Sequence, residues 1–303
     1  MSVTSRADRY AGRDVPPLRA MSARPSIVTQ LREVATYREL ILMLARKDLT
    51  VRYQHSVLGF TWSMVQPVFL LVVYSVVFGI LGAGFARFSI WVLCGLLVWT
   101  LISTSLISAT VSITANASLV GKVRFPRAVL PLASVGAALA HFLLQSVAFA
   151  VVLVVARQRV DWSYVWLLPI ALLTGVVVCA ALAVALAPLN VYARDTMHLL
   201  DLLVLGWFWF TPILYQYERA AGFFSRHGFG EWPLLANPAT PIVITFQRAI
   251  YGRAEVDGIA LLPDHGPGWY LGVLAVTCAV WAVLALAALR LFARADVHLA
   301  ETL

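Results

Sequence analysis

Six long apolar stretches constrain this chain more than any other feature of its sequence. A bilayer core about 30 Å thick is crossed by roughly 20 apolar helical residues, and six segments reach or approach that length: 56–81, 89–113, 128–156, 162–187, 199–215 and 269–292. Composition agrees, because 61% of the 303 residues are hydrophobic and 13% are charged, whereas soluble domains carry about 25% charged residues. The sequence predicts an all-α integral membrane protein with six transmembrane helices. In the fifth, Thr211-Pro212 is expected to interrupt the helical hydrogen bonds near the end of the span.

The basic residues predict how these helices are oriented. If the amino terminus is cytoplasmic, 16 of the 23 Lys and Arg residues lie on the inner side and 7 on the outer side. The short segment 121–127 carries three basic residues and no acidic one. Cytoplasmic loops are rich in Lys and Arg, so we expect both termini in the cytoplasm. Topology then accounts for the net charge of +8, and no nucleic-acid partner is expected.

The segments outside the spans differ in character. Residues 1–25 are polar and Arg-rich, without the apolar core of a signal peptide, and we expect a disordered cytoplasmic arm. In residues 26–55 apolar side chains recur every three or four positions between charged ones, which predicts an amphipathic helix in the membrane interface. The transmembrane domain is expected at 56–292 and a cytoplasmic tail at 293–303.

The longest loop, 216–268, is predicted to form a cap on the outer face. Its apolar run Ala239–Tyr251 spans only about 20 Å as a helix, too short to cross the bilayer. We interpret it as a re-entrant or interfacial helix, with a second short helix near 219–226. An ordinary folded loop is the alternative.

Several sequence signatures of catalysis are absent. The chain has no G-x-x-x-x-G-K-[ST] phosphate loop, no HExxH, no GxSxG and no paired carboxylates inside a predicted span. Its three cysteines are far apart in apolar runs, as expected of small buried side chains. We therefore expect a chain that is not an enzyme by itself and holds no metal or cofactor, so that energised transport needs an external motor.

Three segments, taken together, resemble the membrane subunit of ABC-2 type polysaccharide exporters. The first is KDLTVRYQHSVLGFTWSMVQP at 47–67 and the second is SLVGKVRFPR at 118–127, followed by Leu130-Pro131. The third comprises LNVYARD at 189–195, WFWFTPILY at 207–215, Asn237-Pro238 and Arg248. The resemblance covers about residues 30–292, in the same order and with matching gaps.

The resemblance implies a function and a set of partners. The family exports lipid-linked glycans such as O-antigen, teichoic acid, capsule and galactan precursors across the bacterial plasma membrane. It implies a homodimer of this chain with two copies of a separate ABC ATPase, which binds ATP and Mg. Two rival functions remain: an ABC-2 exporter of small lipids or drugs, and a membrane-embedded enzyme that modifies glycans.

The basic tip of the loop between the second and third spans is the candidate for coupling to the ATPase. The segment 113–127 is predicted as a short polar helix with an aromatic residue flanked by cations, and the resemblance implies that it is the coupling helix. Contact with lipid headgroups is the alternative, and both can hold at once. The residues concerned are Lys122, Val123, Arg124, Phe125, Pro126 and Arg127.

Aromatic residues are the candidates for the substrate channel, because the faces of sugar rings pack well on aromatic rings. The resemblance places the first and fifth spans along the pore. The residues are Trp62, Tyr74, Phe78, Trp207, Phe208, Trp209, Phe210 and Tyr215. Neighbours on a helix diverge by about 100°, so we expect about half of 207–210 to line the pore. An interfacial aromatic belt is the alternative for the residues near the outer leaflet.

A phosphate-bearing lipid headgroup also needs a cationic contact at the cytoplasmic surface. Basic residues gather where the amphipathic helix meets the first span. The candidates are Arg46, Lys47, Arg52 and His55.

Overall fold

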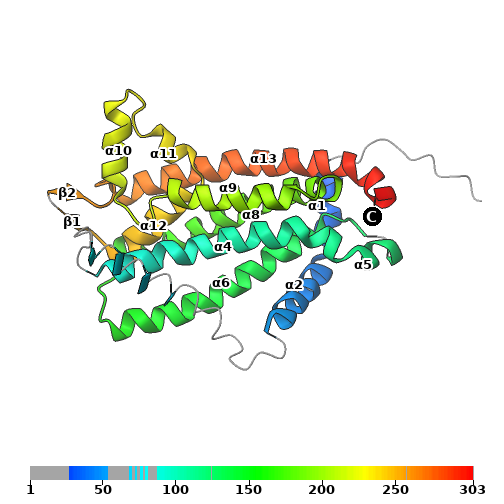
Figure 1. Cartoon of the computed structure of the whole chain (residues 1–303), viewed down its shortest axis with the longest axis horizontal. Coiled ribbons are helices and arrows are strands. Elements are labelled where there is room, and N and C mark those ends of the chain that lie inside the picture. Colours follow the sequence, from blue (N-terminus) through cyan, green and yellow to red (C-terminus); the bar gives the residue numbers. More distant parts are fainter. Residues whose placement is uncertain are drawn as a thin grey trace, which may run out of the picture.

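The computed structural model describes residues 27–53, 68–69, 72–73, 76–77, 79–80, 87–123, 125–256 and 258–302. Within these residues the chain is almost entirely helical, and five helices run side by side along the longest axis of the molecule (Figure 1). They are α4 (Phe88–Ala115), α6 (Val129–Val155), α8 (Leu168–Tyr192), α9 (Thr196–Phe210) and α13 (Pro267–Thr302).

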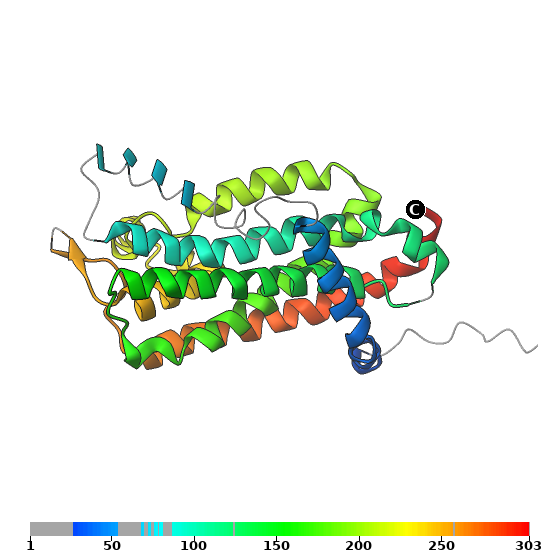
Figure 2. The same ribbon diagram turned by 90° about the horizontal axis from the view of Figure 1, so that it is seen from below.

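The shorter elements gather at the two ends of this bundle (Figures 1 and 2). One end, here called the basic end, holds α1 (Ile27–Thr36), α2 (Arg38–Tyr53), α5 (Ala117–Lys122) and the last turns of α13. The opposite end, here called the cap end, holds α7 (Trp162–Val165), α10 (Tyr217–Arg226), α11 (Trp232–Ala236), α12 (Ala239–Tyr251) and the antiparallel hairpin β1 (Glu255–Val256) and β2 (Ile259–Ala260).

Four of the described helical segments are long and apolar enough to cross a membrane: Phe88–Ala115, Val129–Val155, Trp162–Tyr192 and Pro267–Arg294. They confirm as helices the predicted spans 89–113, 128–156, 162–187 and 269–292. The predicted first span, 56–81, lies outside the described residues except for eight of them. The arm predicted at 1–25 lies outside them entirely.

The fifth predicted span, 199–215, is shorter in the structure. Helix α9 starts earlier, at Thr196, and ends at Phe210, giving 15 residues. The helix ends here because Pro212 has no N–H to donate to the backbone hydrogen bonds of the helix. Its ring also restricts the preceding Thr211 to an extended conformation (φ −99°, ψ 132°). The interruption expected at Thr211-Pro212 is confirmed, and the predicted end at Tyr215 is wrong.

Two other predicted boundaries also move. Helix α8 continues past Ala187 to Tyr192 although Pro188 lies inside it, in the last turns, where the loss of one hydrogen bond is tolerated. No helix end marks the start of the predicted tail 293–303, because α13 continues without interruption to Thr302.

The predicted amphipathic helix at 26–55 is two helices that meet at Tyr37. The Thr36 hydroxyl donates to the Arg32 carbonyl at 2.8 Å, and the Tyr37 N–H is shared between the carbonyls of Glu33 and Val34. Such back-bonding bends helices. The apolar face is confirmed, since Leu44 is buried in a cluster at the basic end. This cluster joins α2 to the ends of α4, α6, α8 and α13 through Leu44, Ile113, Ala128, Val129, Leu130, Ala133, Val184, Ala187, Ala288 and Phe292.

Helix α4 is the centre of the larger core. In its most apolar stretch 72% is buried inside the protein, against 28% for α6 and 17% for α13. Trp91, Ile102 and Leu106 on α4 are fully buried. The outer faces of α6 and α13 instead expose aliphatic side chains such as Val147 and Val283, as expected for helices that face lipid.

The contact between α4 and the segment after α9 is tight, and it yields a prediction. A Cβ on Gly95 would lie 2.7 Å from the Cγ2 methyl of Ile213, a side chain that is fully buried and cannot swing aside. Replacing Gly by Ala within a helix ordinarily gains about 1 kcal/mol, but overpacking costs about 1–3 kcal/mol. We expect Gly95→Ala to lower the thermal midpoint of the detergent-solubilised protein.

The matched control is Gly206→Ala on α9, where no described residue lies within 4 Å of the added methyl. It should leave the midpoint unchanged or raise it. A Gly95→Ala midpoint equal to that of the control would show that the contact with Ile213 is not as close as described.

Candidate functional site

The predicted coupling segment is a helix only in part. Helix α4 runs to Ala115, α5 covers Ala117–Lys122, and Val123 is already extended. The prediction of one helix over 113–127 is therefore wrong at both ends. Lys122 is exposed at the end of α5, and Val123 follows with an exposed fraction of 52%.

The aromatic residue of this tip does not stand free. Phe125 is half-buried and packs against the cluster at the basic end, together with Leu119 and Val120 of α5. Pro126 and Arg127 are also half-buried, and Arg124 lies outside the described residues. Among the described residues of 122–127 the exposed ones are Lys122 and Val123, and Phe125 fixes the segment that carries them to the bundle.

The structure describes the side chains of two of the four candidate headgroup residues, Arg46 and Lys47. Lys47 on α2 donates from Nζ to Asn116 Oδ1 at 3.0 Å, and Asn116 Nδ2 donates to the Ser112 carbonyl at 2.8 Å. Asn116 is the junction between α4 and α5, so Lys47 ties the amphipathic helix to the coupling segment, a link that the sequence analysis missed. Arg46 is exposed, while the Arg52 side chain and His55 lie outside the described residues.

The aromatic run of α9 is split between two faces. Trp207 and Phe208 pack inward on Trp99 of α4, with ring centroids 5.8 and 5.5 Å apart and edge-to-face geometry. Trp209 and Phe210 point outward, with 54% and 73% of their surface exposed. The expectation that about half of 207–210 line the pore stays a prediction, with Trp209 and Phe210 as the two residues that face away from the subunit core. Trp207 and Phe208 are residues of the subunit's own core.

The outward aromatics belong to a continuous apolar face of α9. Leucines on the same helix are more than half exposed, namely Leu199, Leu202, Leu203 and Leu205. Tyr215 is half-buried in the turn after the helix. The remaining channel candidates, Trp62, Tyr74 and Phe78, lie outside the described residues.

The predicted short helices of the loop 216–268 are present. Helix α12 has the predicted bounds, Ala239–Tyr251, and nearly all of its side chains are buried against α4, α7, α8 and α13. Helix α10 covers Tyr217–Arg226 and extends away from the bundle (Figure 1). Burial and the neighbouring Glu231 raise the pKa of the Glu218 carboxyl on α10, so this group takes up a proton at a higher pH than an ordinary glutamate.

A polar network holds the end of α12, and the sequence analysis did not foresee it. Gln158 donates from Nε2 to the Ile250 and Tyr251 carbonyls at 3.2 and 3.4 Å, and Arg87 donates to Gln158 Oε1 at 2.6 Å. Because the last carbonyls of a helix have no partner within it, Gln158 supplies what the end of α12 lacks.

Arg248 is the buried cation of this network. Its side chain is 3% exposed and lies 3.9 Å from the Asp161 carboxylate, and its guanidinium carbon is 4.5 Å from the centre of the Tyr164 ring. Asp161 also caps α7, accepting from the Ser163 N–H at 3.2 Å. Arg248 therefore fastens α12 to α7 through an ion pair and a cation–π contact.

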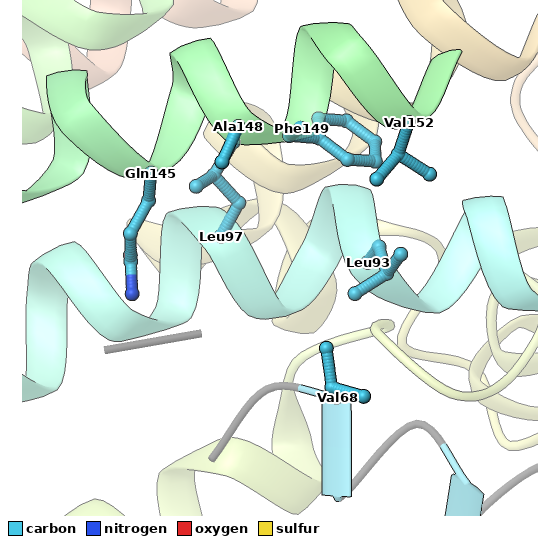
Figure 3. A pocket seen from close by; sticks show the side chains of 7 residues that line it. All are labelled: Val68, Leu93, Leu97, Gln145, Ala148, Phe149 and Val152. Atoms are coloured by element: carbon cyan, nitrogen blue, oxygen red, sulfur yellow. The ribbon is translucent and has the colours of Figure 1, made fainter. Parts of the chain in front are cut away.

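A cavity of about 200 Å³ lies between α4 and α6 (Figure 3). Among the described residues that line it, Gln145 is the one polar residue; the others are Val68, Leu93, Leu97, Ala148, Phe149 and Val152. Such walls suit hydrocarbon and not a hydrated glycan. In the described part of the chain no group of His, Cys, Asp and Glu side chains is arranged to hold a metal ion.

Comparison with known proteins identifies the family. Residues 39–249, from the start of α2 to the end of α12, match the family described as ABC-2 type transporter. The chain belongs to this family. It is thus an integral membrane protein of a transport family, as the sequence motifs predict.

Its relatives include permeases of polysaccharide export. The chain is 30% identical over 257 residues to the "O-antigen export system permease protein RfbA" of Myxococcus xanthus, which covers 84% of this chain and 94% of that protein. It is 28% identical over 210 residues to the protein of the same name from Klebsiella pneumoniae, covering 69% of this chain and 79% of that protein.

The Arg248 network leads to a prediction about stability. Asp161→Asn keeps the cap of α7 but leaves the Arg248 charge buried without its carboxylate, which costs about 3–5 kcal/mol for a broken buried pair. Arg248→Met removes that buried charge and leaves Asp161, 30% exposed, in contact with water. We expect Asp161→Asn to lower the thermal midpoint more than Arg248→Met does.

The double variant Asp161→Asn/Arg248→Met should be more stable than Asp161→Asn alone, since the second change removes the orphaned charge. The measurement is thermal unfolding of all three variants in one detergent. If the midpoint of the double variant fell by the sum of the two single-variant decreases, this result would contradict the ion pair.

Proposed function

We propose that this chain is the membrane subunit of an ATP-driven ABC exporter that moves lipid-linked polysaccharide from the cytoplasm across the bacterial plasma membrane. The observation that carries the proposal is the similarity to an O-antigen export permease over 94% of that relative's length. The sequence adds that the chain has no phosphate loop, so we assign ATP and Mg to a separate ABC ATPase.

The proposed assembly is a homodimer with two copies of that ATPase. The exposed apolar face of α9, with Trp209 and Phe210 near its end, is the surface that we assign to the second copy and to the glycan path. Its two aromatic rings suit a long hydrated glycan, because the faces of sugar rings pack on aromatic rings through many weak and interchangeable contacts. The aromatic residues of the predicted first span, Trp62, Tyr74 and Phe78, are assigned to the same path.

We propose six spans for each subunit, with α12 as a re-entrant helix. Four described segments are long enough to cross, the predicted span 56–81 supplies a fifth, and α9 supplies the sixth. With 15 residues, α9 extends about 22 Å, short of a bilayer core of about 30 Å; the turn at 211–215 completes its path. Helix α12 has only 13 residues and is enclosed by other helices.

The basic end is assigned to the cytoplasm, together with both termini. Its Lys and Arg residues favour that side by the positive-inside rule, and its tip offers Lys122 and Val123 to the ATPase. Arg46, Lys47, Arg52 and His55 are proposed to receive the lipid headgroup at the same surface. The contact between Lys47 and Asn116 supports a connection between the headgroup site and the coupling segment.

The test is transport by the purified chain together with its ATPase in sealed vesicles. Lipid-linked O-antigen is supplied on the ATPase side, and its appearance in the opposite leaflet is measured with and without ATP. We expect ATP-dependent movement that requires both proteins, and no ATP hydrolysis by this chain alone.

A second arm supplies the lipid carrier without its glycan, and a third supplies a small amphipathic drug. Transport of the bare carrier or the drug at the rate of the glycan-bearing lipid would favour an exporter of small lipids. Hydrolysis of ATP by the chain alone would overturn the proposed division of labour.

A further inference from the structure

Asn237 joins the end of α9 to the start of α12. Its Oδ1 accepts from the Trp207 indole N–H at 2.7 Å and from the Ala239 backbone N–H at 3.0 Å. Its Nδ2 donates to the Phe210 carbonyl at 3.3 Å and to Thr211 Oγ1 at 3.0 Å. One side chain therefore binds the last turn of one helix and caps the first turn of another.

These four contacts close a long excursion of the chain. Between Thr211 and Asn237 the chain leaves the bundle, forms α10 and α11, and returns. Both ends of the excursion carry groups that a helix leaves unpaired, the last carbonyls of α9 and the first N–H groups of α12. An amide side chain can serve both, because it accepts at one atom and donates at the other.

The two helices that Asn237 joins are held very differently. Buried residues on α9 form a single stripe, Leu200, Val204 and Phe208, whereas α12 is buried over almost its whole length. A helix held along one stripe can slide or tilt against its neighbour more easily than one that is enclosed. At the end of α9 the direct hydrogen bonds to α12 and its start, among the described residues, are those of Asn237 and, just after the helix, the bond from Gln247 Nε2 to the Ile213 carbonyl at 3.4 Å.

Helix α12 itself contains unsatisfied polar groups in this arrangement. Among the described residues, Thr240 Oγ1 and Gln247 Oε1 are buried without a hydrogen-bond partner, and they lie seven positions apart on the same face of the helix. Buried polar atoms of this kind destabilise the state that contains them. A shift of α12 that gives these two atoms hydrogen-bond partners would therefore lower its free energy.

We propose that Asn237 is a positioning residue that makes α9 and α12 move as one unit during transport. The proposal rests on the proposed export function and deepens it: movement of the span that carries the outward aromatics is transmitted to the helix enclosed at the cap end. Asn237 contacts no substrate in this role and acts through α9 and α12.

The first test measures export and ATP hydrolysis in the same vesicles, using the complex with its ATPase and lipid-linked O-antigen. Asn237→Ala removes all four contacts and should lower the amount exported per ATP by about tenfold, with hydrolysis nearly unchanged. Trp207→Phe removes one hydrogen bond and keeps the ring against Trp99, so the ratio should fall about threefold. Asn237→Asp keeps both acceptor contacts, so its ratio of export to hydrolysis should lie between those of Asn237→Ala and the unmodified complex.

Trp166→Phe is the matched control, because it makes the same change and also removes one indole hydrogen bond, to the Ser163 carbonyl at 2.8 Å, but lies between α7 and α8, outside the assigned glycan path. It should leave the ratio unchanged. An equal loss of export and hydrolysis in Asn237→Ala would indicate a merely structural role and overturn the proposal. A ratio as low in Trp166→Phe as in Trp207→Phe would also overturn it.

A second measurement does not depend on the substrate. Spin labels at Leu202→Cys on α9 and Glu255→Cys, just after α12, report whether the two helices keep their separation. In the complex without the Asn237 substitution we expect the same distance between the labels with and without ATP. In the Asn237→Ala background we expect this distance to change when ATP is added. An unchanged distance in that background would overturn the proposal. If the complex exports no glycan but the labels behave as expected, the proposed function fails and the linkage of α9 to α12 stands.

Discussion

Hydrocarbon offers no hydrogen-bond partner to a backbone N–H or C=O group, and this constraint decides where the polar side chains of the structure lie. Within a helix every backbone group is satisfied, but each helix end leaves several groups unpaired. Asn237 serves two ends at once, and Gln158 serves the end of α12. Both of these amide side chains thus lie where helices end and need partners for their last or first backbone groups.

The same constraint divides the molecule into two ends with different tasks. At the basic end, Lys47 and Asn116 connect the amphipathic helix to the junction of α4 and α5, and Phe125 fixes the tip to the bundle. At the cap end, Arg248, Asp161 and Gln158 fasten α12 in place. Between the two ends lie long apolar helices, and under the proposed function they would carry a push at the basic end toward the cap end. This arrangement suits a subunit that transmits work done by a partner.

The sequence predicted what depends on apolar length and on proline, and it missed what depends on contacts between distant segments. Long apolar runs identified α4, α6, α8 and α13, and Pro212 identified the interruption after α9. The bounds of α12 match the predicted apolar run 239–251, which Pro238 and Gly252 flank in the sequence. The bend at Tyr37 was missed because no Gly or Pro marks it. The links from Lys47 to Asn116 and from Asn237 to Trp207 join residues 69 and 30 positions apart, which no local pattern reveals. The inward packing of Phe125 escaped prediction for the same reason.

The account depends above all on the two ends lying on opposite sides of the membrane, with the basic end in the cytoplasm. Single cysteines at Val123 on the tip and Phe229 on the cap, in a chain that also carries Cys278→Ala, test this directly; the other two native cysteines, Cys94 and Cys179, are buried. A membrane-impermeant maleimide added to intact cells should label the cysteine at 229 and leave the one at 123 unmodified until the membrane is opened. Labelling of the cysteine at 123 in intact cells would place the tip outside the cell, beyond the reach of any cytoplasmic ATPase, and would contradict the account.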